Sequence, residues 1–128
     1  MKIVKVVCGI IYFQDKILLA RRKEGKSMAS KWEFPGGKVE TNELEIEALQ
    51  RELLEEFGME VIVKEKFANN IHDYGTISIN LIAYSCDFIS ATFKLTDHDA
   101  YAWVSPVALH TYDLAAADIP FVALINQS

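Results

Sequence analysis

The pattern of hydrophobic and polar residues predicts a β-rich chain with one long helix. Two runs rich in β-branched residues, Lys2–Phe13 and Lys16–Arg21, flank the dipeptide Gln14-Asp15, as the strands of a β-hairpin do. Later apolar runs bounded by polar, Gly or Pro residues indicate further extended segments. These are expected at Trp32–Phe34, which stops at Pro35-Gly36-Gly37, and at Met59–His72, Thr76–Phe88, Thr92–Leu95 and Tyr101–Val104.

The pattern becomes helical over residues 41–57. Apolar side chains recur there at intervals of three and four residues and therefore share one face of a helix; they are Ile46, Leu49, Leu53 and Phe57. Thr41 or Asn42 can cap the first turn, and Asn42 with Glu45 has the spacing of a capping box. Gly58 stands where a glycine commonly ends a helix.

A helical turn after Pro106 and a terminal helix from about Ala115 complete the predicted elements. We therefore expect an α+β fold in which a mixed sheet is flanked by helices. The 128 residues suit a single domain, residues 1–128, because domains usually run to about 100–200 residues. With 51% hydrophobic and 24% charged residues, the chain can form one core and is not expected to be disordered.

The two cysteines, Cys8 and Cys86, lie far apart and have no Cys or His neighbour at metal-ligand spacing. We therefore expect small buried hydrophobes in a reducing compartment, and neither a disulfide scaffold nor a zinc site. The longest apolar run, Val6–Phe13, is far shorter than the ~20 residues that span a bilayer. No small-residue cleavage site follows it, so we expect a cytoplasmic protein that does not bind membranes.

Negative charge is concentrated in one short window of the chain. The whole sequence carries 18 acidic and 13 basic residues, a net charge of −5. Residues 41–58 alone hold six acidic residues and one basic residue, and the other 12 acids and 12 bases cancel. The acidic members of this window are Glu43, Glu45, Glu47, Glu52, Glu55 and Glu56, with Arg51 as the base.

Three of these carboxylates fall on one stripe of the predicted helix, because offsets of three and four residues stack along a helix: Glu52, Glu55 and Glu56. A solvated acidic face is the commonest meaning of such a run. Crowded like charges nevertheless destabilise a helix unless a cation neutralises them. Hard divalent cations such as Mg²⁺ select carboxylate oxygens and complete their shell with water and substrate phosphate. Charge alone leaves both readings open.

The surrounding spacing favours the metal site. Gly37 is followed after five residues by Glu43, and after seven more by RELLEEFGM at residues 51–59. This stretch resembles the Nudix box, G-x5-E-x7-R-E-U-x-E-E-x-G-U with U apolar, at all nine specified positions over 23 residues. The resemblance implies an α/β/α sandwich, a loop–helix–loop that binds Mg²⁺ or Mn²⁺, and hydrolysis of a nucleoside diphosphate linked to another moiety.

The same resemblance assigns roles to individual residues. The expected metal ligands are the carbonyl of Gly36 and the side chains of Glu52, Glu55 and Glu56. The proton of the attacking water is expected to pass to Glu52, Glu55 or Asp97. Asp97 stands where the family commonly has Glu, and its shorter side chain leaves its role open. Structural roles fall to Gly37, Glu43, Arg51 and Gly58, with Glu43 and Arg51 as an ion pair.

Outside the box, the chain resembles the MutT-like group, which includes 8-oxo-dGTP diphosphatases and CTP pyrophosphohydrolases. The resemblance lies in WEFPGGK at residues 32–38, LAAADIP at 114–120, Arg21-Arg22 and the spacing from Asp97-His98 to Trp103. Substrate contacts are expected from Arg22, Glu33, Phe34, Lys38 and Asp118. Phe34 can stack on the base and Asp118 can bind its polar edge, although Asp118 can equally cap the terminal helix.

The charge around the glycine loop fits a phosphate-bearing substrate. Residues 21–38 have a net charge of +4, from six basic and two acidic residues, although lysines of this kind commonly only solubilise a surface. MutT has Asn in place of Asp118, whereas CTP pyrophosphohydrolases resemble this chain in carrying Asp. The two tryptophans are expected in the core or the walls of a cleft. No role is assigned to His72 or His110, nor to His98, although it follows Asp97.

We therefore expect a Mg²⁺-dependent nucleoside triphosphate pyrophosphohydrolase that converts a nucleoside triphosphate and water into the monophosphate and diphosphate. The base is left open between (d)CTP-type and 8-oxo-dGTP-type substrates. Alternatives are a Nudix hydrolase of ADP-ribose, a dinucleoside polyphosphate or a nucleotide sugar, and a non-enzymatic nucleotide sensor. A nucleic-acid polymer is not expected as a partner, because no basic sheet interleaved with aromatic residues is evident. The oligomeric state is not predicted.

Overall fold

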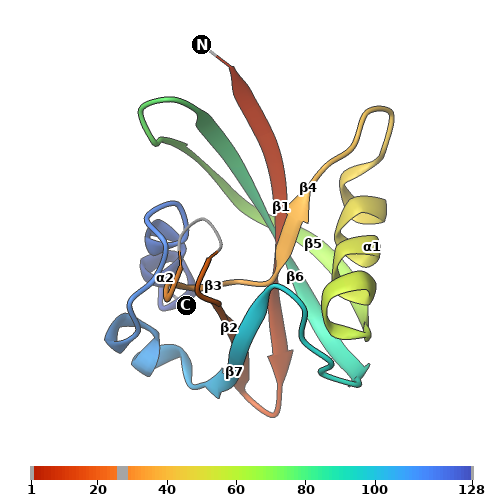
Figure 1. Ribbon diagram of the computed structural model, residues 1–128. Coiled ribbons are helices and arrows are strands. Elements are labelled where there is room, and N and C mark those ends of the chain that lie inside the picture. Colours follow the sequence, from red (N-terminus) through yellow and green to blue (C-terminus); the bar gives the residue numbers. More distant parts are fainter. Residues whose placement is uncertain (1, 26–28, 128) are drawn as a thin grey trace.

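A mixed seven-stranded sheet forms the centre of this computed structural model, which describes residues 2–25 and 29–127 (Figure 1). Five strands lie in the order β3-β2-β1-β6-β5, while β4 pairs with β1 and β7 pairs with β2. The strands are β1 (Ile3–Phe13), β2 (Lys16–Arg22), β3 (Trp32–Glu33), β4 (Gly36–Lys38), β5 (Met59–Asp73), β6 (Ser78–Ala91) and β7 (His98–Val104). The central pair β1 and β6 is parallel, and the other pairs are antiparallel.

The predicted hairpin at the start of the chain is confirmed. Tyr12 lies opposite Ile17 and Phe13 opposite Lys16, which leaves a two-residue turn. Both turn residues have positive φ, 50° at Gln14 and 66° at Asp15. Two-residue hairpin turns need this conformation because it matches the right-handed twist of the flanking strands.

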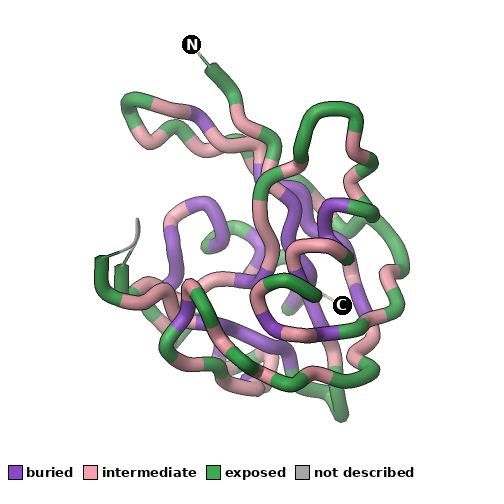
Figure 2. Tube along the Cα trace, turned by 45° about the vertical axis from the view of Figure 1, so that its right-hand side comes forward, coloured by how far each residue is buried: buried purple, intermediate pink, exposed green. Residues whose placement is uncertain are grey.

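Helices cover both faces of the sheet, as Figure 1 shows. The long helix α1 (Glu45–Phe57) packs on one face, where Leu49, Leu53 and Phe57 contact alternate residues of β1 and β2. The other residues of these strands form a second core with a 3₁₀ helix, η1 (Pro106–Thr111), and the terminal helix α2 (Ile119–Ile125). The middle of both strands, residues 7–11 and 17–20, is therefore buried from both sides. Figure 2 colours buried residues purple along the whole chain.

The start of α1 differs from the prediction. The helix begins at Glu45, and Glu47 Oε1 accepts the N–H of the N-cap residue Leu44 at 3.0 Å. This is half of a capping box, because leucine has no side-chain acceptor for the return bond. The expected pairing of Asn42 with Glu45 was wrong, because Asn42 lies in the left-handed region with φ of 66°. The prediction for the other end is confirmed: Gly58 has φ of 57° and its N–H bonds back to Leu54 O.

Three further boundaries differ from those predicted. Thr92–Leu95 was expected to be a strand, but Phe93 has φ of 53° and its N–H bonds to Phe57 O, so the segment closes over the end of α1. The terminal helix begins at Ile119 and not near Ala115. The dipeptide Gly36-Gly37, expected to end a strand, is itself part of β4. Within the described residues, no helix has the length and apolar character needed to cross a membrane.

Candidate functional site

Two adjacent glycines hold β4 close to β1 and to α1. Gly36 lies opposite Cys8 in the β1–β4 pair, and a Cβ at Gly36 would overlap the carbonyl oxygen of Val7. A Cβ at Gly37 would overlap the carboxylate of Glu52. Both positions therefore need glycine because backbone or carboxylate atoms occupy the space of a side chain. This packing brings the glycine segment and the acidic helix together.

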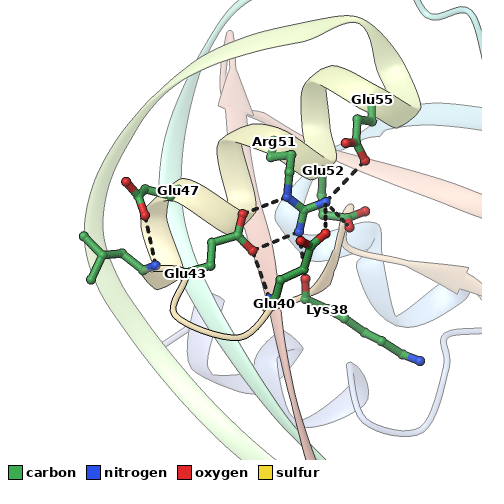
Figure 3. A network of polar contacts seen from close by, with 8 residues as sticks. Lys38, Glu40, Glu43, Glu47, Arg51, Glu52 and Glu55 are labelled. Atoms are coloured by element: carbon green, nitrogen blue, oxygen red, sulfur yellow. Dashed lines mark hydrogen bonds and ion pairs between the residues drawn. The ribbon is translucent and has the colours of Figure 1, made fainter.

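Arg51 joins the loop before α1 to the helix, as Figure 3 shows. Its Nε and Nη2 donate to both carboxylate oxygens of Glu43 at 2.7 and 3.0 Å. Its Nη1 contacts Glu52 Oε1 at 2.9 Å and Glu55 Oε2 at 3.3 Å, and its Nη2 also donates to Lys38 O at 3.1 Å. One guanidinium thus connects β4, the loop and two turns of α1. The structure brings Glu43 and Arg51 together as the motif predicts.

Two acidic residues at the start of the motif have lowered pKa values. Hydrogen bonds from Arg51 and from the Glu40 backbone N–H lower the pKa of Glu43 to about 2. Burial raises the pKa of Glu45, but hydrogen bonds from Tyr84, Lys5 and Lys66 outweigh burial and lower it to about 2. These carboxylates are therefore charged and neutralised by partners within the protein.

The carboxylates at the end of α1 have the opposite property. Burial raises the pKa of Glu56 to about 8, helped by a hydrogen bond with Asp97 and by the charges of Glu52, Asp97 and Glu33. Burial also raises the pKa of Glu52, although Arg51 opposes this effect. Glu52, Glu56 and Asp97 therefore form an acidic cluster, named here the carboxylate cluster.

The carboxylate cluster fits a bound cation in its chemistry. Glu56 Oε2 is buried and has no hydrogen-bond partner in the described part of the chain. A buried oxygen of this kind is unfavourable unless something positive or hydrogen-bonding approaches it. In the arrangement present, no three His, Cys, Asp or Glu side chains of residues 2–25 and 29–127 converge as ready ligands. Arg51 contacts one oxygen of Glu52 and one oxygen of Glu55.

A cavity of about 430 Å³ lies beside the glycine segment. Its walls come from β1, β2, β3, β4, β6, the β5–β6 turn and the segment before α2. Each of the five residues expected to contact substrate lines it: Arg22, Glu33, Phe34, Lys38 and Asp118. The two glycines of β4 line it as well, so the cavity and the carboxylate cluster meet at Gly36-Gly37. The structure therefore joins residues from five separate parts of the sequence.

Asp118 is a buried acid of the cavity wall. The residue is 5% exposed, and its Oδ2 accepts the Phe34 backbone N–H at 2.9 Å. Burial and the charge of Glu33 raise the pKa of Asp118, while the bond from Phe34 opposes them. Asp118 precedes α2, but its side chain makes no capping hydrogen bond to that helix. The carboxyl group therefore belongs to the cavity and not to the helix cap.

Some residues expected at the site are buried in the core, lie outside the cavity or pair with other side chains. Phe34 lines the cavity but is only 2% exposed and packs in the core, with its ring centre 6.4 Å from that of Phe121. Glu55 is exposed and does not line the cavity. Several basic residues of the stretch 21–38 pair elsewhere: Arg21 with Asp99 at 2.8 Å and Lys31 with Asp113 at 2.9 Å. Lys26, counted in the basic stretch, lies outside the described residues.

Three side chains that sequence reasoning left without a role also belong to this region. Tyr74 lines the cavity, and its hydroxyl accepts the Ala117 N–H at 3.0 Å. Asn70 donates to the carbonyl of the same Ala117 at 3.0 Å, so β5 and its turn hold the segment that carries Asp118. His98 contacts Glu33 at 2.8 Å. Only the position of His98 beside Asp97 hinted at this placement.

Comparisons with known proteins agree with the geometry. Residues 6–124 match a family model described as the NUDIX domain. The CTP pyrophosphohydrolase of Escherichia coli K12 is 41% identical over 122 residues, which cover 95% of this chain and 90% of the relative. An 8-oxo-dGTP diphosphatase of Haemophilus influenzae is 32% identical over 130 residues, covering 99% and 95%. The solution structure of the E. coli ORF135 protein superposes with a TM-score of 0.85 at 41% identity, covering 97% of this chain and 89% of that one.

Proposed function

Because the chain belongs to the Nudix family, we propose that it is a nucleoside triphosphate pyrophosphohydrolase that converts a nucleoside triphosphate and water into the monophosphate and diphosphate. The observation that carries the proposal is the junction at Gly36-Gly37 between a cavity of about 430 Å³ and the carboxylate cluster. The cavity has the size of a small-molecule site. Relatives named for hydrolysis of CTP and 8-oxo-dGTP support this substrate class.

The reaction in this proposal requires a divalent cation, with Mg²⁺ as the physiological ion and Mn²⁺ as a substitute. The ligands would be Glu52, Glu55, Glu56 and the carbonyl of Gly36, and the unpartnered Glu56 Oε2 supports this set. When bound, the cation offsets phosphate charge and acidifies water. Glu52, Glu55 or Asp97 takes the proton of the attacking water. Arg22 and Lys38, both in the cavity wall, bind phosphate oxygens.

The base is recognised in the cavity in this proposal. Asp118 is held by the Phe34 N–H through Oδ2, which leaves its other oxygen for the polar edge of a base. Glu33 offers a second carboxylate in the same wall. The acidic wall favours bases that present N–H donors, which cytosine and 8-oxoguanine both do. We therefore propose a (d)CTP-type or 8-oxo-dGTP-type substrate.

The test is kcat/KM, measured by diphosphate release with Mg²⁺, for 8-oxo-dGTP, dGTP, CTP, dCTP, 5-methyl-dCTP and ADP-ribose. We expect one of the triphosphates to be preferred. Glu56→Gln should lower turnover by orders of magnitude and remain folded, because it removes a metal-binding charge but keeps the side-chain shape. Dominant hydrolysis of ADP-ribose would contradict the substrate class. Binding of nucleotides without diphosphate release would indicate a sensor and contradict the enzymatic proposal.

The cellular setting belongs to the same proposal. We place the protein in the cytoplasm and treat residues 1–128 as one domain. Cys8 and Cys86 are both buried and free, which suits a reducing compartment. The role that follows is hydrolysis of selected nucleotides in the cellular pool, with no nucleic-acid polymer or membrane as a partner.

A further inference from the structure

His98 is a buried histidine next to the cavity. Of the three histidines, all within the described residues, it alone is buried, and its side chain has no exposed surface. Its Nε2 lies 2.8 Å from Glu33 Oε2. Burying a polar ring in this way is favourable only when the ring makes a strong hydrogen bond. The contact with Glu33 is the one that the described part of the structure provides.

The surroundings of His98 define its tautomer. A carboxylate can only accept hydrogen bonds, so Nε2 must carry the proton that it shares with Glu33. His98 Nδ1 is buried and has no hydrogen-bond partner among residues 2–25 and 29–127. With a proton at Nε2, Nδ1 can remain an acceptor, and a buried unpaired acceptor is less unfavourable than a buried unpaired N–H. His98 therefore acts as a hydrogen-bond donor to Glu33.

The bond from His98 restricts how Glu33 can be used. Glu33 Oε2 also contacts Arg22 Nη1 at 3.5 Å, so both contacts fall on the same oxygen. Glu33 Oε1 forms no hydrogen bond with the described residues, and it is not among their buried unpartnered atoms. Because Glu33 lines the cavity, Oε1 is the oxygen left for a ligand. When one oxygen of a carboxylate is held by hydrogen bonds, the other oxygen points in a defined direction.

His98 also connects this wall to the end of α1. Its ring packs against Phe57, with ring centres 5.0 Å apart and planes inclined by 30°. Phe57 follows Glu56 directly, and His98 follows Asp97. In the β2–β7 pair, His98 lies opposite Arg22 at an irregularity of the ladder. The position of Glu33 is therefore tied through one side chain to the helix that carries the carboxylate cluster.

We propose that His98 is a positioning residue that orients Glu33 in the cavity and thereby sets the discrimination between nucleobases. A base that offers an N–H to Glu33 Oε1 gains a charge-assisted hydrogen bond only if that oxygen is held in place. Without His98, Glu33 turns more freely and distinguishes such a base less well from its competitors. This inference rests on the proposed nucleotide hydrolysis and adds a residue outside the Nudix box.

Three variants at position 98 separate the hydrogen bond from the packing. His98→Gln places an amide N–H near the former Nε2 and keeps the donor to Glu33. His98→Asn places its amide near the former Nδ1, which does not reach Glu33, and His98→Leu has no donor. His110→Leu is the matched control, because His110 is exposed and bonds only to Val107 O in the described chain. Thermal unfolding of each variant reports on folding.

The measurement is kcat and KM for the nucleotides of the panel, together with the inhibition constant of inorganic tripolyphosphate, which has phosphates but no base. We expect His98→Leu and His98→Asn to lower kcat/KM for the preferred nucleotide about tenfold, equivalent to about 1.4 kcal/mol, mainly through KM. The preference over other bases should narrow by a similar factor. His98→Gln should retain most of the kcat/KM for the preferred nucleotide and most of the preference over other bases. The inhibition constant of tripolyphosphate should be unchanged in all three variants.

A double-mutant cycle with Glu33→Gln tests the route of the effect. If His98 acts through Glu33, His98→Leu should change selectivity little in a Glu33→Gln background. Additive effects, an equal loss of tripolyphosphate binding, or no difference between the Gln and Asn variants would overturn the inference. If His98→Leu does not fold, the Gln and Asn variants carry the same comparison. Absence of nucleotide hydrolysis by the wild type would instead overturn the proposed function.

Discussion

Replacing Glu56 with glutamine should remove a loss of stability that the metal-free protein undergoes as the pH rises. The folded protein raises the pKa of Glu56 to about 8 from an ordinary value of 4.5, mainly by burial. The folded state therefore favours the protonated form. Below a pH of about 4.5 both states hold the proton and the contribution to stability is complete. Above it the unfolded chain releases the proton first, so the free energy of unfolding falls until the pH reaches about 8.

The size of this effect can be bounded from the same values. A difference of about 3.5 in pKa corresponds to roughly 5 kcal/mol, at about 1.4 kcal/mol for each pH unit. Solvent reaches part of the side chain and screens its charge, so we expect about 2 kcal/mol. For a domain of this size, that energy corresponds to about 8 °C in the midpoint of thermal unfolding.

The assay is urea or thermal unfolding of the metal-free wild type and of Glu56→Gln at several values between about pH 5 and pH 8. The difference between their midpoints should change steadily across this range, in favour of the variant at high pH. Glu60→Gln is the control, because Glu60 is exposed and has no side-chain partner in residues 2–25 and 29–127. Added Mg²⁺ should raise the midpoint of the wild type more than that of Glu56→Gln. Parallel profiles for wild type and variant would refute the reasoning.

Two further substitutions test the motif. Arg51→Lys should lower the midpoint of thermal unfolding by about 5 °C. Lysine cannot make the paired bonds to Glu43 and also hold Glu52 and Lys38 O. An unchanged midpoint would contradict the role of Arg51 in connecting the loop to the helix. Gly37→Ala should lower kcat at least about tenfold in the diphosphate-release assay with a smaller effect on folding, because its Cβ displaces the Glu52 carboxylate. Wild-type kcat would show that Glu52 does not need this position.

Local patterns in the sequence predicted the helix α1 and the ion pair that joins it to the preceding loop. The helical period placed four apolar residues on one face, and the structure confirms Leu49, Leu53 and Phe57 in the core. Ile46, the first of the four, is exposed, because it lies in the first turn of α1. The resemblance to the box likewise predicted the ion pair of Glu43 with Arg51. The N-terminal cap was missed for a physical reason. The N-cap is the apolar Leu44, which capping preferences do not select, and it follows Glu43, which Arg51 holds by two hydrogen bonds.

The cavity was only partly predictable, because it joins residues that are far apart in the sequence. Resemblance to a family located the wall residues one by one, but nothing local indicated that His98 would meet Glu33, 65 residues earlier. That contact depends on the pairing of β2 with β7 and on the irregularity beside Arg22. Tyr74 was given no role, since its bond to Ala117 spans 43 residues. Side chains whose partners come from distant strands carry no periodic signal.

The negative charge of residues 41–58 divides into two sets with opposite electrostatic environments. Glu43 and Glu45 have pKa values lowered to about 2 by arginine, lysine and hydroxyl partners, so their charge serves the structure of the loop and helix. Glu52 and Glu56, about two and three turns after Glu45 along α1, have raised pKa values. A helix that needed only a solvated acidic face would have no reason to bury the second set beside Asp97. The division therefore favours an external cation beside Glu56, whose buried Oε2 has no hydrogen-bond partner among residues 2–25 and 29–127, whereas the protein supplies partners for the first set.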